Sequence, residues 1–155
     1  MTAALDLTAG DVSSLEFKKT RWHKWVELEA LGLDDCEIEC NGMSWAFSHQ
    51  MTQKGIEHEC MAGYVTRKHT CEAVVPHYWI ELPGGWILDL RLRMWLGDTD
   101  QVPHGVFHRS HAASLGIHYT GEPEDRSGVE YTLPFLDALT YGMIHGVEFS
   151  HPDEV

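Results

Sequence analysis

The chain has 155 residues, the length of one ordinary domain, so we expect a single domain over residues 1–155. Hydrophobic residues make up 43% and charged residues 23%, which excludes a disordered or collagen-like chain. Its 11 Lys and Arg against 24 Asp and Glu give a formal net charge of −13 at pH 7. Because such a surface repels phosphate groups and anionic lipid, we expect neither a nucleic acid nor a membrane as partner.

The sequence favours a cytoplasmic protein. No apolar run approaches the roughly 18 residues that span a bilayer, and residues 1–14 lack the basic and apolar regions of a secretory signal. In a reducing compartment the four cysteines are not expected to form disulfides. Cys36 and Cys40 are followed by no second close pair, so we predict no metal and no cofactor. A catalytic cysteine therefore remains possible, and the residues near each cysteine must indicate which one it is.

Two helices are predicted in the first third of the chain. Apolar residues recur at helical spacing from Ser14 to Leu31, with Ser13 or Ser14 as N-cap and Gly32 as the end. After an acidic loop over residues 34–39, a second helix fits residues 41–54, whose apolar side chains share one face. Gly55 follows this helix in the position where a left-handed backbone would end it.

Beyond Gly55 the periodicity changes to that of strands. Residues 56–66, 74–82 and 86–90 are short and rich in Val, Ile, Tyr and Trp. Pro83-Gly84-Gly85 lies between the last two and predicts a hairpin that makes them antiparallel. Helices followed by antiparallel strands predict an α+β fold.

The remaining segments give weaker patterns. Residues 91–96 could continue the third strand, and residues 103–121 are irregular and contain four histidines. Residues 133–143 predict a short helix opened by Pro134. We expect the ends, residues 1–13 and 150–155, to be flexible because they are small and polar.

Three side chains form a candidate catalytic group. Cys40 lies at the start of the second helix, where free N–H groups and the helix dipole stabilise a thiolate and can receive an oxyanion. His77 and Asp89 lie on strands joined by the predicted hairpin, so the carboxylate can hold the imidazole in one tautomer. A helix-borne Cys facing a His oriented by an Asp is the arrangement that a thiol nucleophile requires.

These residues resemble a known family. CNGMSWAF from Cys40, followed by Gly55-Ile56 and Gly63-Tyr64-Val65, is similar to the core of the transglutaminase-like superfamily. HYWIEL from His77, followed by Gly85-Trp86 and Asp89, resembles that family's HxWxE…W…D pattern. The resemblance covers roughly residues 39–90, and Tyr78 departs from it because the family usually has Ala there.

The resemblance implies a papain/transglutaminase-like α+β fold, in which the nucleophile helix packs on an antiparallel sheet. It implies Cys40 as nucleophile, His77 as general base and acid, and Asp89 as the orienting carboxylate. The expected activity is hydrolysis of a peptide or isopeptide amide through an acyl-enzyme. Deamidation or crosslinking of a protein glutamine uses the same first half-reaction and remains an alternative.

The substrate is expected to be a protein or peptide, contacted by aromatic residues near the triad. These are Trp45, Tyr78 and Trp79, of which Tyr78 would narrow the cleft and Trp79 would share the face of His77. Glu81 falls on that face too and is read as solvated or salt-bridged rather than as a second acid.

Alternative interpretations involve other cysteines and the histidines. Cys36 could be the nucleophile instead, but its acidic loop raises a thiol pKa, and Cys60 and Cys71 are read as structural or incidental. Four histidines at positions 104, 108, 111 and 118 could form a metal cluster that hydrolyses substrate, yet the surrounding Pro and Gly disfavour one helical face. A non-catalytic binding module or inhibitor that keeps the fold is the other alternative.

Overall fold

A computed structural model describes residues 18–126 and 131–155 of the protein. The fold is α+β, with five strands in one antiparallel sheet of order β4-β3-β2-β1-β5. The strands are β1 (Glu59–Arg67), β2 (Glu72–Leu82), β3 (Trp86–Asp89), β4 (Gly105–His108) and β5 (Ile117–Pro123). The helices are α2 (Arg21–Ala30), α3 (Cys40–Gln53), α4 (Arg93–Leu96), α5 (Arg109–Ser114) and α6 (Leu133–Leu139), with short 3-10 turns η1 (Leu31–Leu33), η2 (Met143–Gly146) and η3 (Pro152–Glu154).

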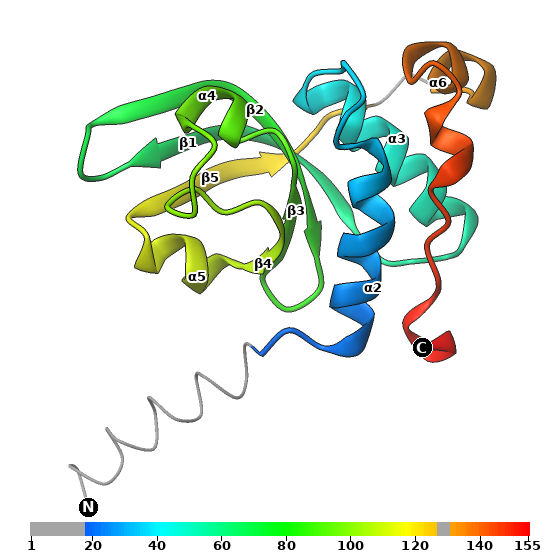
Figure 1. Ribbon diagram of the computed structural model, residues 1–155, viewed down its shortest axis with the longest axis horizontal. Coiled ribbons are helices and arrows are strands. Elements are labelled where there is room, and N and C mark those ends of the chain that lie inside the picture. The colour runs from blue at the N-terminus through cyan, green and yellow to red at the C-terminus, as the bar shows by residue number, and fades with distance from the viewer. Residues whose placement is uncertain (1–17, 127–130) are drawn as a thin grey trace, which may run out of the picture.

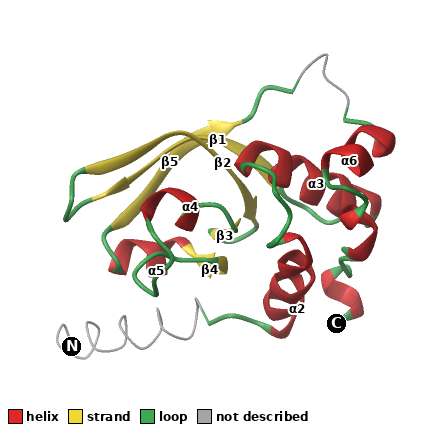
Figure 2. Ribbon diagram, turned by 45° about the horizontal axis from the view of Figure 1, so that its top comes forward, coloured by secondary structure: helices red, strands yellow, loops and turns green. Residues whose placement is uncertain are grey.

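The sheet is strongly curved and has helices on both sides. Helices α2, α3 and α6 gather on one side, whereas α4 and α5 lie on the other, inside the curve (Figures 1 and 2). Side chains of successive strand residues point to opposite faces of the sheet, so one strand can contribute side chains to two hydrophobic cores. Ile80 and Leu88 join the core beneath α2, α3 and α6, and Trp79 and Ile87 join the core beneath α4 and α5.

The first predicted helix is shorter than expected within the described residues. Helix α2 begins at Arg21, and the predicted caps Ser13 and Ser14 lie outside those residues. Its N-cap is Thr20, whose hydroxyl accepts the His23 N–H, while the His23 ring accepts the Thr20 N–H in return. This reciprocal pair satisfies two N–H groups that no intrahelical carbonyl can reach.

The second helix and the hairpin are confirmed. Helix α3 covers residues 40–53 against the predicted 41–54, and Gly55 follows with the expected left-handed backbone at φ +66°. The turn at residues 83–85 joins β2 and β3 in the antiparallel register Leu82↔Trp86. Both turn glycines have φ above +80°, which residues with a Cβ rarely adopt.

Two later segments differ from the sequence analysis. The suggested continuation of β3 over residues 91–96 is wrong, since the chain turns after Asp89 and forms α4. Residues 103–121 showed no regular pattern but hold β4, α5 and most of β5. The expected helix at 133–143 is divided into α6 and η2. The last residues, 150–155, include η3, and the Ser150 carbonyl accepts a hydrogen bond from Trp22.

A close approach of β1 to β5 fixes the centre of the sheet. Gly63 pairs with His77 on β2 and with Gly121 on β5. A Cβ at Gly63 would overlap the Thr120 carbonyl oxygen, so only glycine fits there. Within the described residues no helix combines the length and the apolar character needed to cross a bilayer.

Candidate active site

Cys40 is the first residue of α3. Glu39 is the N-cap and has an extended backbone, but its side chain makes no capping hydrogen bond. The backbone N–H groups of Cys40 and Asn41 likewise have no acceptor among the described residues, as expected for the first turn of a helix. The thiol is half-buried and therefore reachable. A carbonyl oxygen bound beside it would meet free N–H donors and the positive end of the helix dipole.

His77 and Asp89 form a buried pair. The imidazole Nε2 lies 2.7 Å from the carboxylate Oδ2, and the exposed fractions of the two residues are 0% and 3%. They come together because β2 and β3 pair around the 83–85 turn, with Ile80 opposite Leu88, which puts both side chains on the same face. Trp79 stacks near the imidazole, with ring centroids 6.0 Å apart.

The His77 imidazole is held as a cation. Burial alone would lower its pKa, but the Asp89 carboxylate and the Cys40 thiol outweigh it and raise the pKa from 6.5 to about 10. Nδ1 is buried and makes no hydrogen bond among the described residues. Since Nε2 belongs to Asp89, Nδ1 is the nitrogen left for Cys40. An imidazolium beside a thiol favours the thiolate.

Asp89 has two more partners, neither of which the sequence analysis identified. The Tyr119 hydroxyl donates to Oδ2 at 2.7 Å, and the Arg91 N–H donates to Oδ1 at 2.9 Å. Burial would raise the pKa of Asp89, but His77 and these donors lower it, so the carboxylate stays ionised. In turn, burial and the Asp89 charge raise the pKa of Tyr119 well above 10, which keeps its hydroxyl a donor.

Arg91 connects this carboxylate to the loop that leads into Cys40. Its guanidinium is buried beneath residues 34–39 and donates to the carbonyls of Cys36 at 2.6 Å and Ile38 at 2.7 Å. It also pairs with Asp34. The same residue therefore contacts Asp89 through its backbone and fixes the loop leading into Cys40 through its side chain.

Two of the three predicted substrate-contacting aromatics line space next to Cys40. Tyr78, together with Val75, Pro76 and Trp95, borders a hollow of about 460 Å³ that includes Cys40. Trp45 lines a second hollow, of about 440 Å³, which includes Glu39 and Asn41, the sequence neighbours of Cys40. Trp79 lines neither, because it is 1% exposed and packs edge-on against Tyr119 in the core. It therefore supports His77 from behind instead of facing substrate.

The other three cysteines lack this environment. Cys36 is buried and donates to the Thr140 carbonyl, and burial raises the pKa of its thiol. Burial likewise raises the pKa of Cys60, which is contacted by Arg126. Cys71 is exposed on the β1–β2 turn. All four cysteines are free thiols.

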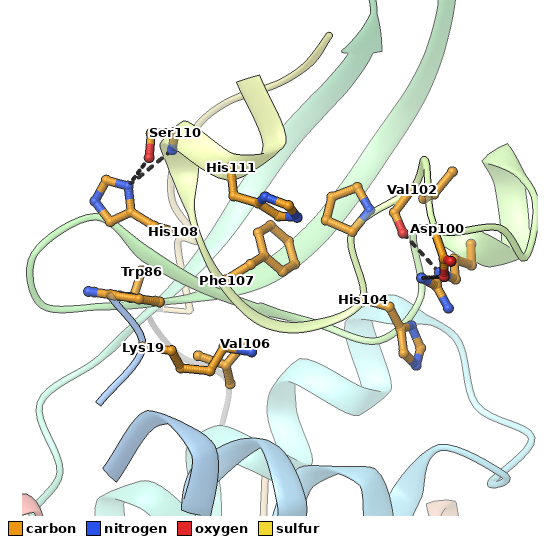
Figure 3. Close-up of a pocket in the computed structure, with 12 residues that line it drawn as sticks. Lys19, Trp86, Asp100, Val102, His104, Val106, Phe107, His108, Ser110 and His111 are labelled. Carbon is orange, nitrogen blue, oxygen red and sulfur yellow. Dashed lines mark hydrogen bonds and ion pairs between the residues drawn. The ribbon is translucent and has the colours of Figure 1, made fainter. Parts of the chain in front are cut away.

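The histidines of residues 104–118 do not converge. Three of them line a hollow of about 560 Å³, where His104 and His108 lie at opposite ends (Figure 3). His104 bonds to Asp34, and His108 bonds to Ser110 and the Gly84 carbonyl. No three His, Cys, Asp or Glu side chains among the described residues are grouped to hold a metal ion.

Among the described residues, this hollow also lacks a thiol and an unpaired Lys or Arg. Lys19 pairs with Glu27, and Arg93 pairs with Asp98 and Asp100, so its cations already have partners. Its one hydroxyl nucleophile, Ser110, is hydrogen-bonded to His108. Glu81, read earlier as solvated or salt-bridged, is paired with Arg109.

Comparison of the chain with protein-family models, with curated proteins and with solved structures finds no match. The candidate site therefore stands on its geometry alone. It brings together a half-buried thiol at a helix start, an imidazolium and an ionised carboxylate, with Tyr119 and Arg91 holding the carboxylate. Such a group can attack a carbonyl carbon and deliver a proton to the leaving atom.

Proposed function

We propose that the protein is a cysteine-dependent amide hydrolase of the peptidase or isopeptidase type, with a transglutaminase-like fold. The observation that carries the proposal is the buried imidazole of His77, which Asp89 holds through Nε2 and whose pKa the Cys40 thiol helps to raise. A purely structural role for His77 would not require a half-buried thiol next to the second nitrogen of its ring. The four free thiols also suit a reducing compartment, for which we propose the cytoplasm.

In the proposed reaction the Cys40 thiolate attacks the amide carbonyl carbon and forms a carbon–sulfur bond. The carbonyl oxygen becomes an oxyanion, which the free N–H groups at the start of α3 receive. The carbon–nitrogen bond then breaks, and the leaving amine takes the proton from Nδ1 of His77. Water attacks the resulting thioester while His77 accepts its proton, which releases the acid and restores the thiolate–imidazolium pair.

Site-resolved alkylation tests the nucleophile. The protein is treated with iodoacetamide at pH 6.5 and the labelling of each cysteine is followed by peptide mass spectrometry. We expect Cys40 to react at least about ten times faster than the exposed Cys71, because an adjacent imidazolium favours the thiolate. The His77→Gln variant should lose this excess while Cys71 reacts as before. Equal, slow labelling of Cys40 and Cys71 would exclude an activated thiol.

Incubation with a peptide mixture then separates the possible reactions by their products. Hydrolysis yields shortened peptides, deamidation yields a glutamate in place of a glutamine, and crosslinking yields a joined pair. All three should vanish in Cys40→Ala. Association with peptides but no product in the wild type would favour the non-catalytic binding module.

A further inference from the structure

Two hollows meet at the nucleophile. The first, here called the Trp95 hollow, is lined by Ala73, Val74, Val75, Pro76, Tyr78 and Trp95. The second, the Tyr141 hollow, is lined by Glu37, Ile38, Gly42, Trp45, Leu139 and Tyr141. Glu39 and Asn41, on either side of Cys40 in the sequence, line both. The two hollows are therefore neighbours at the start of α3, and together they are called the groove here; the Cys40 thiol lines the Trp95 hollow.

The Trp95 hollow has an apolar wall that is open to solvent. Val75 is 68% exposed and Trp95 is 57% exposed, although both are large hydrophobic residues. They come from β2 and α4, elements far apart in the sequence, yet they border the same space beside Cys40. Exposed apolar groups gathered around a hollow are typical of a binding site for an apolar group.

The charged residues of the groove are all acidic. Glu37 and Glu39 are exposed, and neither side chain makes an ion pair or a hydrogen bond among the described residues. No Lys, Arg or His lines either hollow. The nearest cation of the loop, Arg91, is buried beneath it and holds its carbonyls. In the hollow lined by the three histidines, by contrast, Lys19 and Arg93 each have a carboxylate partner.

We propose that this groove binds an extended polypeptide that carries a basic side chain toward Glu37 and Glu39 and an apolar side chain toward Val75 and Trp95. The substrate class rests on the proposed function, since the amide bond between these side chains would lie over Cys40. Charge complementarity selects the basic residue, because two unpaired carboxylates line the groove in a chain of net charge −13. Burial of exposed Trp95 and Val75 supplies the contact with the apolar residue.

Binding is measured separately from cleavage. Fluorescein-labelled peptides bind to the full chain carrying Cys40→Ala, with anisotropy as the readout. One peptide combines Arg or Lys with Leu or Phe on the other side of a central amide, and a matched peptide has Glu in place of the basic residue. We expect the basic peptide to bind at least about tenfold more tightly, and the difference to shrink as salt is added.

Paired substitutions locate the contacts. The double substitution Glu37→Gln and Glu39→Gln should weaken binding of the basic peptide about three- to tenfold. The control Glu57→Gln, at an exposed carboxylate beyond the far end of α3, should leave that binding unchanged. Trp95→Ala should weaken binding through the apolar residue, whereas Trp25→Ala on α2 should leave it unchanged. The inference is overturned if either groove variant binds like its control, or if the acidic peptide binds as well as the basic one.

The same peptides distinguish this inference from the proposed function. If the wild-type protein cleaves basic, neutral and acidic peptides at equal rates, the amide hydrolase stands and the preference is wrong. If the basic peptide binds with the expected charge dependence but the wild type changes no peptide, the groove stands and the hydrolase is wrong.

Discussion

Replacing Asp89 by Asn tests the centre of the proposed site with almost no change in size. The Asp89 carboxylate accepts from His77, from the Tyr119 hydroxyl and from the Arg91 N–H. An Asn side chain has one acceptor oxygen and one donor NH₂. At least one of the three donors then faces another donor, in a place that is 3% exposed.

The loss of stability follows from the burial of the pair. Removing one partner of a buried ion pair costs about 3–5 kcal/mol, because the other is left uncompensated. In a chain of this size that corresponds to a fall in Tm of about 6–20 °C. Urea and thermal unfolding measure it, with Asp35→Asn as the control because that carboxylate is exposed.

The His77 charge should be lost together with the carboxylate. Burial lowers the pKa of His77 and is the largest single influence on it, so without Asp89 the pKa should fall from about 10. A smaller fraction of the imidazole is then charged at a given pH, and alkylation of Cys40 should slow. Amide hydrolysis should fall by about 10³–10⁴, the loss seen when a triad loses its carboxylate.

The pH dependence of the unfolding free energy tests whether His77 and Asp89 are both charged in the folded protein. The pKa of His77 is raised from 6.5 to about 10, so its contribution is complete below pH 6.5 and is lost as the pH rises toward 10. The pKa of Asp89 is lowered from 3.8, so its contribution is present above pH 3.8 and is lost in more acidic solution. The difference in unfolding free energy between wild type and Asp89→Asn should therefore be largest near pH 5–6 and shrink by pH 10. A difference that is constant over this range would refute the buried ion pair.

Three further substitutions test the surrounding contacts. Tyr119→Phe removes one hydrogen-bond donor to Asp89, so the free energy of unfolding measured in urea should fall by about 1.5–3 kcal/mol. The acid limb of the pH–rate profile should also move to higher pH. A limb that does not move would contradict the contact. Arg91→Leu leaves the carbonyls of the 34–39 loop without donors and should cost about 3–5 kcal/mol, with that loop becoming sensitive to limited proteolysis; unchanged cleavage would argue against the anchor. Gly63→Ala should lower stability by more than about 2 kcal/mol, because its Cβ overlaps backbone, whereas Gly146→Ala, in open space, should not.

Local patterns in the sequence were sufficient for the elements that position the triad. Helix α3 has apolar residues on one face and a glycine after its end, and both signals lie within residues 40–55. The 83–85 turn fixes the pairing of β2 with β3, so His77 and Asp89 could be placed together from the order of the residues alone. These features depend on contacts between residues close in the sequence.

The parts that were missed depend on distant contacts. β5 pairs with β1 between residues 50 to 62 positions apart, and only the first four residues of its sequence IHYTGEP alternate between buried and exposed before Gly121 and Pro123 interrupt the pattern. Tyr119 reaches Asp89 only because that pairing exists. Residues 93–96 form one helical turn after β3 ends at Asp89, and four residues are too few to show a helical period.

Arg91 links the loop that leads into Cys40 to the carboxylate that holds His77. The loop before Cys40 carries three exposed carboxylates, Asp35, Glu37 and Glu39, which repel one another and would push the loop outward. The guanidinium of Arg91 lies beneath the loop and donates to the carbonyls of residues 36 and 38, which opposes this repulsion. The backbone N–H of Arg91 donates to Asp89. The carboxylates can then face the groove unpaired, because the cation that fixes their backbone is buried on the other side. Positioning of the thiol and an acidic groove therefore have the same physical origin, and Arg91→Leu should impair cleavage of basic peptides and of neutral peptides alike, unlike the Glu37 and Glu39 substitutions.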